Sequence, residues 1–216
     1  MTSTIRRVET ERTPALTLRG VGKTFGHGTD AVTALRGIDL HVEPGEFVCL
    51  LGASGCGKST LLNLVAHLDA PSTGEVELGT ARPSFMFQES ALLPWLTAGR
   101  NVELQRQRVS LARALASATS TDEPGLLLMD EPFAALDAIT RDMLQGELLR
   151  VWEATGTTIL FVTHDVREAI KLAERVVLLS SRPGTVVGEW RVGDGPITLH
   201  DEITGRLRQV ITSHAA

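Results

Sequence analysis

The feature that most constrains this chain is a glycine-rich loop between an apolar stretch and a helix-like one. The loop reads GASGCGKS (52–59), follows EFVCLL (46–51) and precedes apolar residues at helical spacing. Glycines let successive backbone N–H groups turn inward, and the N-terminus of the following helix adds partial positive charge there. The order strand, loop, helix therefore predicts a phosphate-binding loop, in which Lys58 reaches the β and γ phosphates of a nucleotide and Ser59 offers a magnesium ligand.

The remaining pattern predicts one α/β domain. Residues 15–51 read as short β runs broken by turns, and the apolar stretches 126–129 and 158–162 alternate with helical patterns, one of which stops at Gly156. Purely apolar strands that alternate with helices are typical of a parallel sheet covered on both faces. We expect a P-loop NTPase core with a mainly parallel sheet plus an N-terminal antiparallel β region, in a single domain over residues 1–216.

Composition narrows the class of partner and the compartment. The chain has 21 basic and 26 acidic residues and no basic block, so nucleic acid is not expected to bind. No apolar run has the length of a membrane helix, and the N-terminus lacks a signal-like segment, which favours a cytoplasmic protein. Cys49 and Cys56 lack the spacing of a metal site, and no disulfide is expected.

Two adjacent carboxylates follow the strand LLLM, namely Asp130 and Glu131. Alternation along a strand sends neighbouring side chains to opposite sides. Asp130 is then free to hold magnesium through water, while Glu131 faces the γ-phosphate and orients or deprotonates the attacking water. Acidic residues at strand ends are also common helix caps, and the phosphate loop upstream is what favours the catalytic interpretation.

Three single residues carry further hypotheses. His164, at the end of TILFVT, could donate to the γ-phosphate or the attacking water; the amide of Gln88 could contact magnesium and water; Phe25 could stack on adenine. Each residue type is at least as common in structural roles, so these hypotheses need support from a larger pattern.

That pattern is a resemblance to a known family. The segments LLGASGCGKST, FQES, LLLMDEPFAALD and FVTHD, in this order, resemble the Walker A, Q-loop, Walker B with D-loop, and switch-histidine segments of ABC-transporter ATPases. ALLPWLT and RVVLLSSRPGTVVGEW resemble the branch that serves nitrate, sulfonate and taurine importers. The resemblance covers about Leu16 to Trp190. It implies an ATP-hydrolysing importer subunit that uses ATP and Mg²⁺, on the inner face of the cell membrane with a permease and a second ATP-binding subunit.

The resemblance also assigns residue roles. It gives catalysis to Glu131, γ-phosphate sensing to His164 and the D-loop to residues 134–137. Magnesium is assigned to Ser59, Gln88 and Asp130. Nucleotide binding is assigned to Phe25, Gly52, Ala53, Ser54, Gly55, Cys56, Gly57, Lys58, Ser59, Thr60 and Gln88.

One departure from the family pattern is large. In the family a helical subdomain follows the Q-loop and ends in LSGGQ, which closes the ATP site of the opposite subunit. Here only 16 residues separate Gln88 from Gln105, and LSGG does not occur in the chain. We therefore expect a shortened helical subdomain around residues 89–105, which leaves the homodimer expected from the family without its signature contact.

Two alternatives to an importer ATPase follow. The missing LSGG favours a degenerate ATP-binding module without productive turnover or transport coupling. A P-loop kinase acting on a small molecule is the other, although the acid pair, the D-loop and the strand-end histidine have no necessary place in one.

Overall fold

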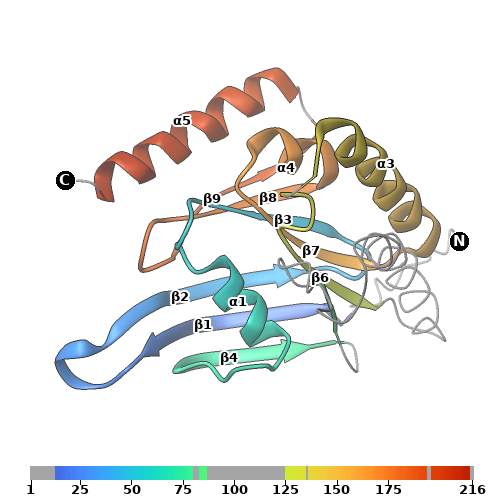
Figure 1. The fold of residues 1–216 in the computed structure, drawn as a ribbon. Coiled ribbons are helices and arrows are strands. Elements are labelled where there is room, and N and C mark those ends of the chain that lie inside the picture. The colour runs from blue at the N-terminus through green and yellow to red at the C-terminus, as the bar shows by residue number, and fades with distance from the viewer. Residues whose placement is uncertain (1–12, 80–82, 87–124, 135, 194–195, 215–216) are drawn as a thin grey trace, which may run out of the picture.

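The computed structural model describes residues 13–79, 83–86, 125–134, 136–193 and 196–214, in which two sheets and their helices pack together (Figure 1). The strands are β1 Leu16–Phe25, β2 Val32–Val42, β3 Phe47–Leu51, β4 Thr73–Leu78, β5 Ser84–Met86, β6 Leu126–Asp130, β7 Thr158–Thr163, β8 Arg175–Leu179 and β9 Val186–Arg191. The helices are α1 Lys58–Val65, α3 Ala138–Thr155, α4 Val166–Leu172, α5 Pro196–His214 and the 3₁₀ turn η1 Gly28–Asp30.

The larger sheet is mainly parallel, as predicted. Its strand order is β5-β6-β7-β3-β8-β9, and only the β8–β9 pair is antiparallel. Every residue of β3, β6 and β7 is buried, which explains why these strands are continuously apolar rather than alternating. In the register of the sheet Leu51 lies opposite Thr163 and Asp130 opposite Val162, so the three strands end at one edge.

The smaller sheet confirms the predicted N-terminal antiparallel region and adds a strand to it. Its order is β2-β1-β4, with both pairs antiparallel. β4 was not anticipated from the sequence. Its residues, TGEVEL, are mostly exposed and polar, so the apolar pattern that marks a strand is weak there.

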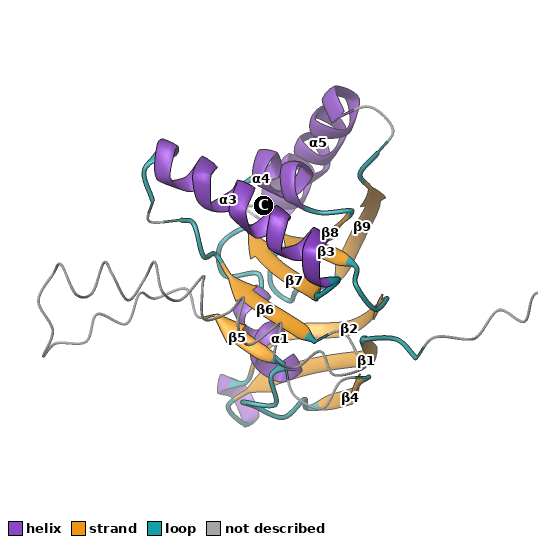
Figure 2. Ribbon diagram, turned by 90° about the vertical axis from the view of Figure 1, so that its right-hand side faces the viewer, coloured by secondary structure: helices purple, strands orange, loops and turns teal. Residues whose placement is uncertain are grey.

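Helix α1 lies between the two sheets, and the other helices cover the far face of the larger sheet (Figure 2). Side chains on β3 alternate between the two cores: Val48 and Leu50 point to α1 and the smaller sheet, whereas Phe47, Cys49 and Leu51 point to the core shared with α3, α4 and α5. This layering fixes the N-terminus of α1 at the edge where β3, β6 and β7 end.

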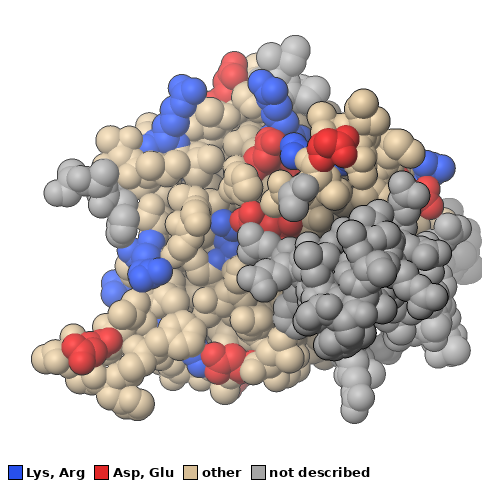
Figure 3. All heavy atoms as spheres, viewed as in Figure 1, with Lys and Arg blue, Asp and Glu red and all other residues tan. Residues whose placement is uncertain are grey.

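Other predicted features can be placed directly. α3 ends at Thr155, and Gly156 follows with φ +62°, as the predicted helix stop requires. Cys49 and Cys56 are both buried and unbridged. Among the helices of the described residues, none has the length and apolarity needed to cross a membrane. On the face drawn in Figure 3, Lys and Arg side chains are scattered among Asp and Glu.

Gln88 and the expected shortened helical subdomain around 89–105 lie outside the described residues. The expected D-loop is described at residues 134, 136 and 137, and Asp137 caps α3 by accepting hydrogen bonds from the backbone of Ile139 and Thr140.

Candidate functional site

The glycine-rich loop joins β3 to α1, and its last glycine is required by both conformation and space. Gly57 has φ +103°, a region that side chains other than glycine rarely adopt. A Cβ on Gly57 would also lie 2.6 Å from Cδ2 of Leu35 and 3.0 Å from the carbonyl oxygen of Ala34. The close approach to β2 lets the loop turn directly into the first residue of the helix.

That first residue is Lys58, whose side chain is only 5% exposed. Its Nζ donates to the carbonyl oxygens of Gly52 (2.8 Å) and Ala53 (3.1 Å). The same nitrogen lies 3.7 Å from Oε1 of Glu131. The loop thus holds its ammonium group in place and points it toward the carboxylate at the end of β6.

Glu131 connects the loop to the neighbouring strand. Its backbone N–H donates to the carbonyl of Val162 on β7 (3.0 Å), and its Oε2 lies 2.9 Å from Nδ1 of His164. Glu131 has φ +43°, so it lies just beyond β6 in a left-handed conformation. Strand alternation was the predicted reason why the side chains of Asp130 and Glu131 point to different sides. In the structure this left-handed turn of the backbone separates them instead. Strained backbone conformations of this kind are common at functional sites.

Asp130 is buried at the last position of β6. Its Oδ1 has no hydrogen-bond partner among the described residues, while the Ser59 side chain hydrogen-bonds to the carboxylate. Burial raises the pKa of Asp130, and the hydrogen bond from Ser59 partly offsets this. A buried, partly unsatisfied carboxylate next to a hydroxyl is a set of oxygen donors suited to Mg²⁺.

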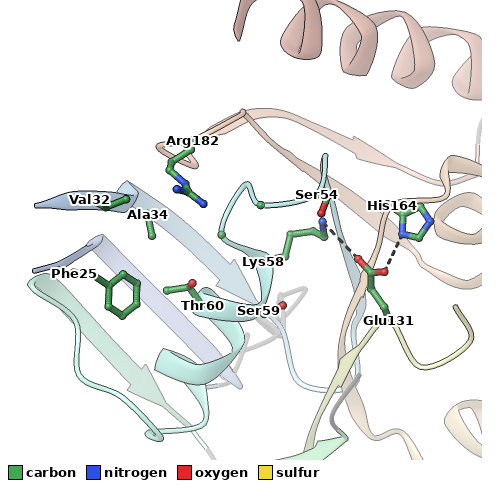
Figure 4. Close-up of a pocket in the computed structure, with 12 residues that line it drawn as sticks. Phe25, Val32, Ala34, Ser54, Lys58, Ser59, Thr60, Glu131, His164 and Arg182 are labelled. Atoms are coloured by element: carbon green, nitrogen blue, oxygen red, sulfur yellow. Dashed lines mark hydrogen bonds and ion pairs between the residues drawn. The ribbon is translucent and has the colours of Figure 1, made fainter. Parts of the chain in front are cut away.

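A cavity of about 590 Å³ opens over these groups (Figure 4). Phe25 stands at one end and is 45% exposed, with Nζ of Lys23 5.1 Å from its ring centroid. Glu131 and His164 lie at the other end (Figure 4). The predicted site residues that line the cavity are Phe25, Ser54, Gly55, Gly57, Lys58, Ser59, Thr60, Glu131 and His164.

The other predicted residues have different positions. Gly52 and Ala53 hold Lys58 through their carbonyl groups, and Cys56 is buried, which raises the pKa of its thiol. Three lining residues were missed: Val32, Ala34 and Arg182. The first two carry no chemical signal. Arg182 belongs to the RPG segment, which contributed only to the family resemblance. The sequence therefore drew attention to this segment but gave Arg182 no role in the site.

The raised pKa of Asp130 yields a prediction about stability. A native-state pKa above the unfolded value means that the group favours folding most at low pH, and that this contribution is lost as the pH rises through the native pKa. At neutral pH the ionised carboxylate therefore costs stability. Asp130→Asn is expected to raise the melting temperature of the ligand-free protein by a few degrees, about the effect of 1 kcal/mol in a domain of this size.

The same variant should lose the extra thermal stabilisation that Mg²⁺ adds in the presence of ATP. Melting curves at pH 7.5 with ATP plus Mg²⁺ and with ATP plus a chelator measure this difference. Asp201→Asn, at an 82% exposed position on α5, is the matched control and should behave as wild type. An Asp130→Asn protein that melts earlier than wild type and keeps the Mg²⁺-dependent gain would contradict the assignment.

Comparison with known proteins identifies the relatives of this chain. A family model described as "ABC transporter" matches residues 35–104. The aliphatic sulfonates import ATP-binding protein SsuB of Bacillus cereus is 40% identical over 214 residues, covering 79% of this chain and 83% of the relative. The bicarbonate transport ATP-binding protein CmpD of Synechocystis is 37% identical over 225 residues, covering 82% of this chain and 78% of the relative. The nitrate import ATP-binding protein NrtD of Synechocystis is 36% identical over 220 residues, with 81% of each covered.

A solved structure has the same fold. The dimeric ATP-binding cassette MJ0796 in a post-hydrolysis state, bound to ADP and Pi, superposes with a TM-score of 0.66 at 27% identity, covering 83% of this chain and 100% of that one. This similarity shows that the chain has the fold of an ABC ATPase cassette.

Proposed function

Because the chain belongs to the family of ABC transporter ATP-binding proteins, we propose that it is the ATPase subunit of an importer for small anions of the sulfonate, nitrate, taurine or bicarbonate type. As a family member it is an ATP-binding ATPase. One structural observation supports the residue roles above all others. Glu131 lies 3.7 Å from Nζ of Lys58 and 2.9 Å from Nδ1 of His164, beside one cavity, although the three residues follow three different strands.

Nucleotide binding is proposed to begin at the glycine-rich loop. Its N–H groups and the N-terminus of α1 favour phosphate oxygens, and Lys58 is preorganised because the carbonyls of Gly52 and Ala53 already hold it. The base would lie on Phe25, whose exposed ring faces the cavity, while Lys23 lies near the ring.

Hydrolysis is proposed to use Glu131 as the residue that orients or deprotonates the attacking water. Lys58 and His164 already contact its two oxygens, so the carboxylate is held at the phosphate end of the cavity. His164, with a side chain that is 60% exposed, is free to turn from Glu131 toward a γ-phosphate and so to sense it.

Ser59 and Asp130 would hold Mg²⁺, and Gln88 is proposed to join them as the family resemblance implies. The unpartnered Oδ1 of Asp130 supports this fit. When bound, the ion would neutralise phosphate charge as it develops during transfer.

The comparisons give no support to the binding-only module or to the small-molecule kinase. The relatives are named as import or transport ATP-binding proteins, and their similarity reaches over both the phosphate loop and the acid pair. These names support a membrane permease as partner and a position on the inner face of the membrane. A dimer is supported by the arrangement of the MJ0796 cassette and opposed by the absence of LSGG here.

We further propose that residues 1–216 form one domain with a helical subdomain shortened around 89–105. The alignment with the Bacillus cereus relative has 214 positions, but it includes only 79% of the 216 residues of this chain, which is about 171 residues. At roughly 40 aligned positions the relative therefore has a residue and this chain has none. The difference has the size expected for a lost group of helices.

A variant of Glu131 tests the catalytic role. Glu131→Gln keeps the shape of the side chain and removes its basicity, so ATP binding should stay within twofold of wild type. Phosphate release in single turnovers should fall by about 10- to 1,000-fold, as for a lost general base. Glu75→Gln, exposed on β4, is the control. If Glu131→Gln releases phosphate as fast as wild type, Glu131 only caps the strand.

A further inference from the structure

Arg182 lines the cavity from a segment that the proposed function does not use. It lies in the β8–β9 loop, residues 180–185, and its side chain extends toward the space between Phe25 and Lys58 (Figure 4). β8 and β9 are distant in sequence from the phosphate loop, so the contact arises only in the folded chain.

The backbone of the β8–β9 loop is anchored to β2. The N–H of Gly184 donates to the carbonyl of Ala34 (2.8 Å), and the N–H of Arg36 donates to the carbonyl of Gly184 (2.9 Å). Within the loop, the Ser180 hydroxyl donates to the carbonyl of Pro183 (2.9 Å). The loop therefore has a defined conformation beside the cavity.

The loop also touches the phosphate loop directly. A Cβ on Gly184 would lie 2.2 Å from the carbonyl oxygen of Cys56, so only glycine fits this approach. Close to this contact, a Cβ on Gly55 would lie 3.8 Å from Nη2 of Arg182. The guanidinium group thus lies near Gly55, at the rim of the phosphate loop.

The charges around Arg182 leave it available to an anion. The structure shows no ion pair or hydrogen bond of its guanidinium with any described residue. The carboxylate of Glu131, at the far end of the cavity, is already in contact with Lys58 and His164. An arginine stays protonated at every physiological pH and offers a fork of N–H donors that fits phosphate oxygens.

We propose that Arg182 binds the polyphosphate of the nucleotide, as a second permanent cation besides Lys58. Its place between Phe25, at the base end, and Lys58, at the γ end, assigns it to the α and β phosphates. The β8–β9 loop then belongs to the nucleotide site. The proposal rests on the proposed function, because it takes the cavity to be the ATP site.

The test compares Arg182→Gln and Arg182→Lys with wild type by calorimetric titration with Mg-ATP and Mg-ADP. Arg182→Gln should weaken both nucleotides about 5- to 30-fold, the loss expected for charge-assisted hydrogen bonds at a partly exposed site. Arg182→Lys should recover part of this loss because it keeps the charge. Arg191→Gln, an exposed arginine on β9, should stay within twofold of wild type.

A second measurement separates phosphate from base contacts. Tripolyphosphate, used to displace a fluorescent ATP analogue, should also bind Arg182→Gln about 5- to 30-fold more weakly than wild type. Unchanged tripolyphosphate binding with weakened ATP binding would overturn the assignment to phosphate. The ligand-free melting temperature should not change, since the Arg182 side chain is exposed.

The outcomes also separate the two proposals. If wild type binds ATP and Arg182→Gln binds it equally well, or if Arg191→Gln loses as much affinity, only the Arg182 proposal fails. If wild type binds no ATP, the proposed function fails and the role of Arg182 with it.

Discussion

Replacing Lys58 with alanine is expected to abolish the binding of Mg-ATP, lowering affinity by at least about 100-fold. The ammonium group is 5% exposed and preorganised by two loop carbonyls, so its attraction to phosphate is weakly screened and needs no rearrangement of solvent. Alanine removes this cation and leaves the carbonyls of Gly52 and Ala53 without their donor. Calorimetric titration measures the loss.

The controls address charge and folding separately. Lys171→Ala removes a 41% exposed lysine that pairs with Asp142, away from the cavity, and should bind ATP as wild type does. Lys58→Met keeps most of the apolar stem without the charge and should fold while failing to bind. Equal ATP affinity of wild type and Lys58→Ala would show that the glycine-rich loop is not the phosphate site.

The second large effect concerns the rate of hydrolysis. The chain is expected to turn over ATP at least about 10⁴-fold more slowly than a family member that has LSGG. Each preorganised donor lost from a developing anionic centre costs about 10²–10³ in rate, and the missing segment supplies more than one. On the proposal that the helical subdomain is shortened, no second chain completes the site, and the rate per molecule should then not depend on protein concentration.

Steady-state phosphate release across a wide range of protein concentrations tests this expectation. The reciprocal construction inserts a helical subdomain containing LSGG between Leu104 and Gln105, and should restore both the rate and its cooperative rise with concentration. A chain without the insert that is already fast and cooperative would prove that it forms a competent dimer, and our account of the missing segment would then be wrong.

Much of the local structure followed from the sequence because it depends on neighbours in the chain. The strand–loop–helix unit at Lys58, the acid pair at the end of β6 and the helix stop at Gly156 are each determined within about ten residues, by apolar period, glycine conformation and capping. The general fold class followed as well, since continuously apolar strands alternating with helices have few other ways to be buried.

The geometry of the site was decided by the tertiary structure. Lys58, Glu131 and His164 follow β3, β6 and β7, and they meet because these strands are neighbours in the order β6-β7-β3. Strand order depends on packing between segments far apart in the chain, which no local pattern encodes. The left-handed conformation of Glu131 also depends on tertiary structure, because it is stabilised by the hydrogen bond from the Glu131 N–H to the carbonyl of Val162 on the next strand.

Arg182 illustrates the same limit. In the sequence, Arg182 is part of a segment that contributed only to the family resemblance, with no role for the arginine itself. The side chain reaches the phosphate loop because Gly184 packs against Cys56 and is hydrogen-bonded to Ala34 on β2, which brings three segments separated by up to 150 residues to one place. Such an approach is fixed by the mutual fit of two sheets and a helix, so the sequence determined that an arginine is present in the turn, and only the folded chain decided that it faces the nucleotide cavity.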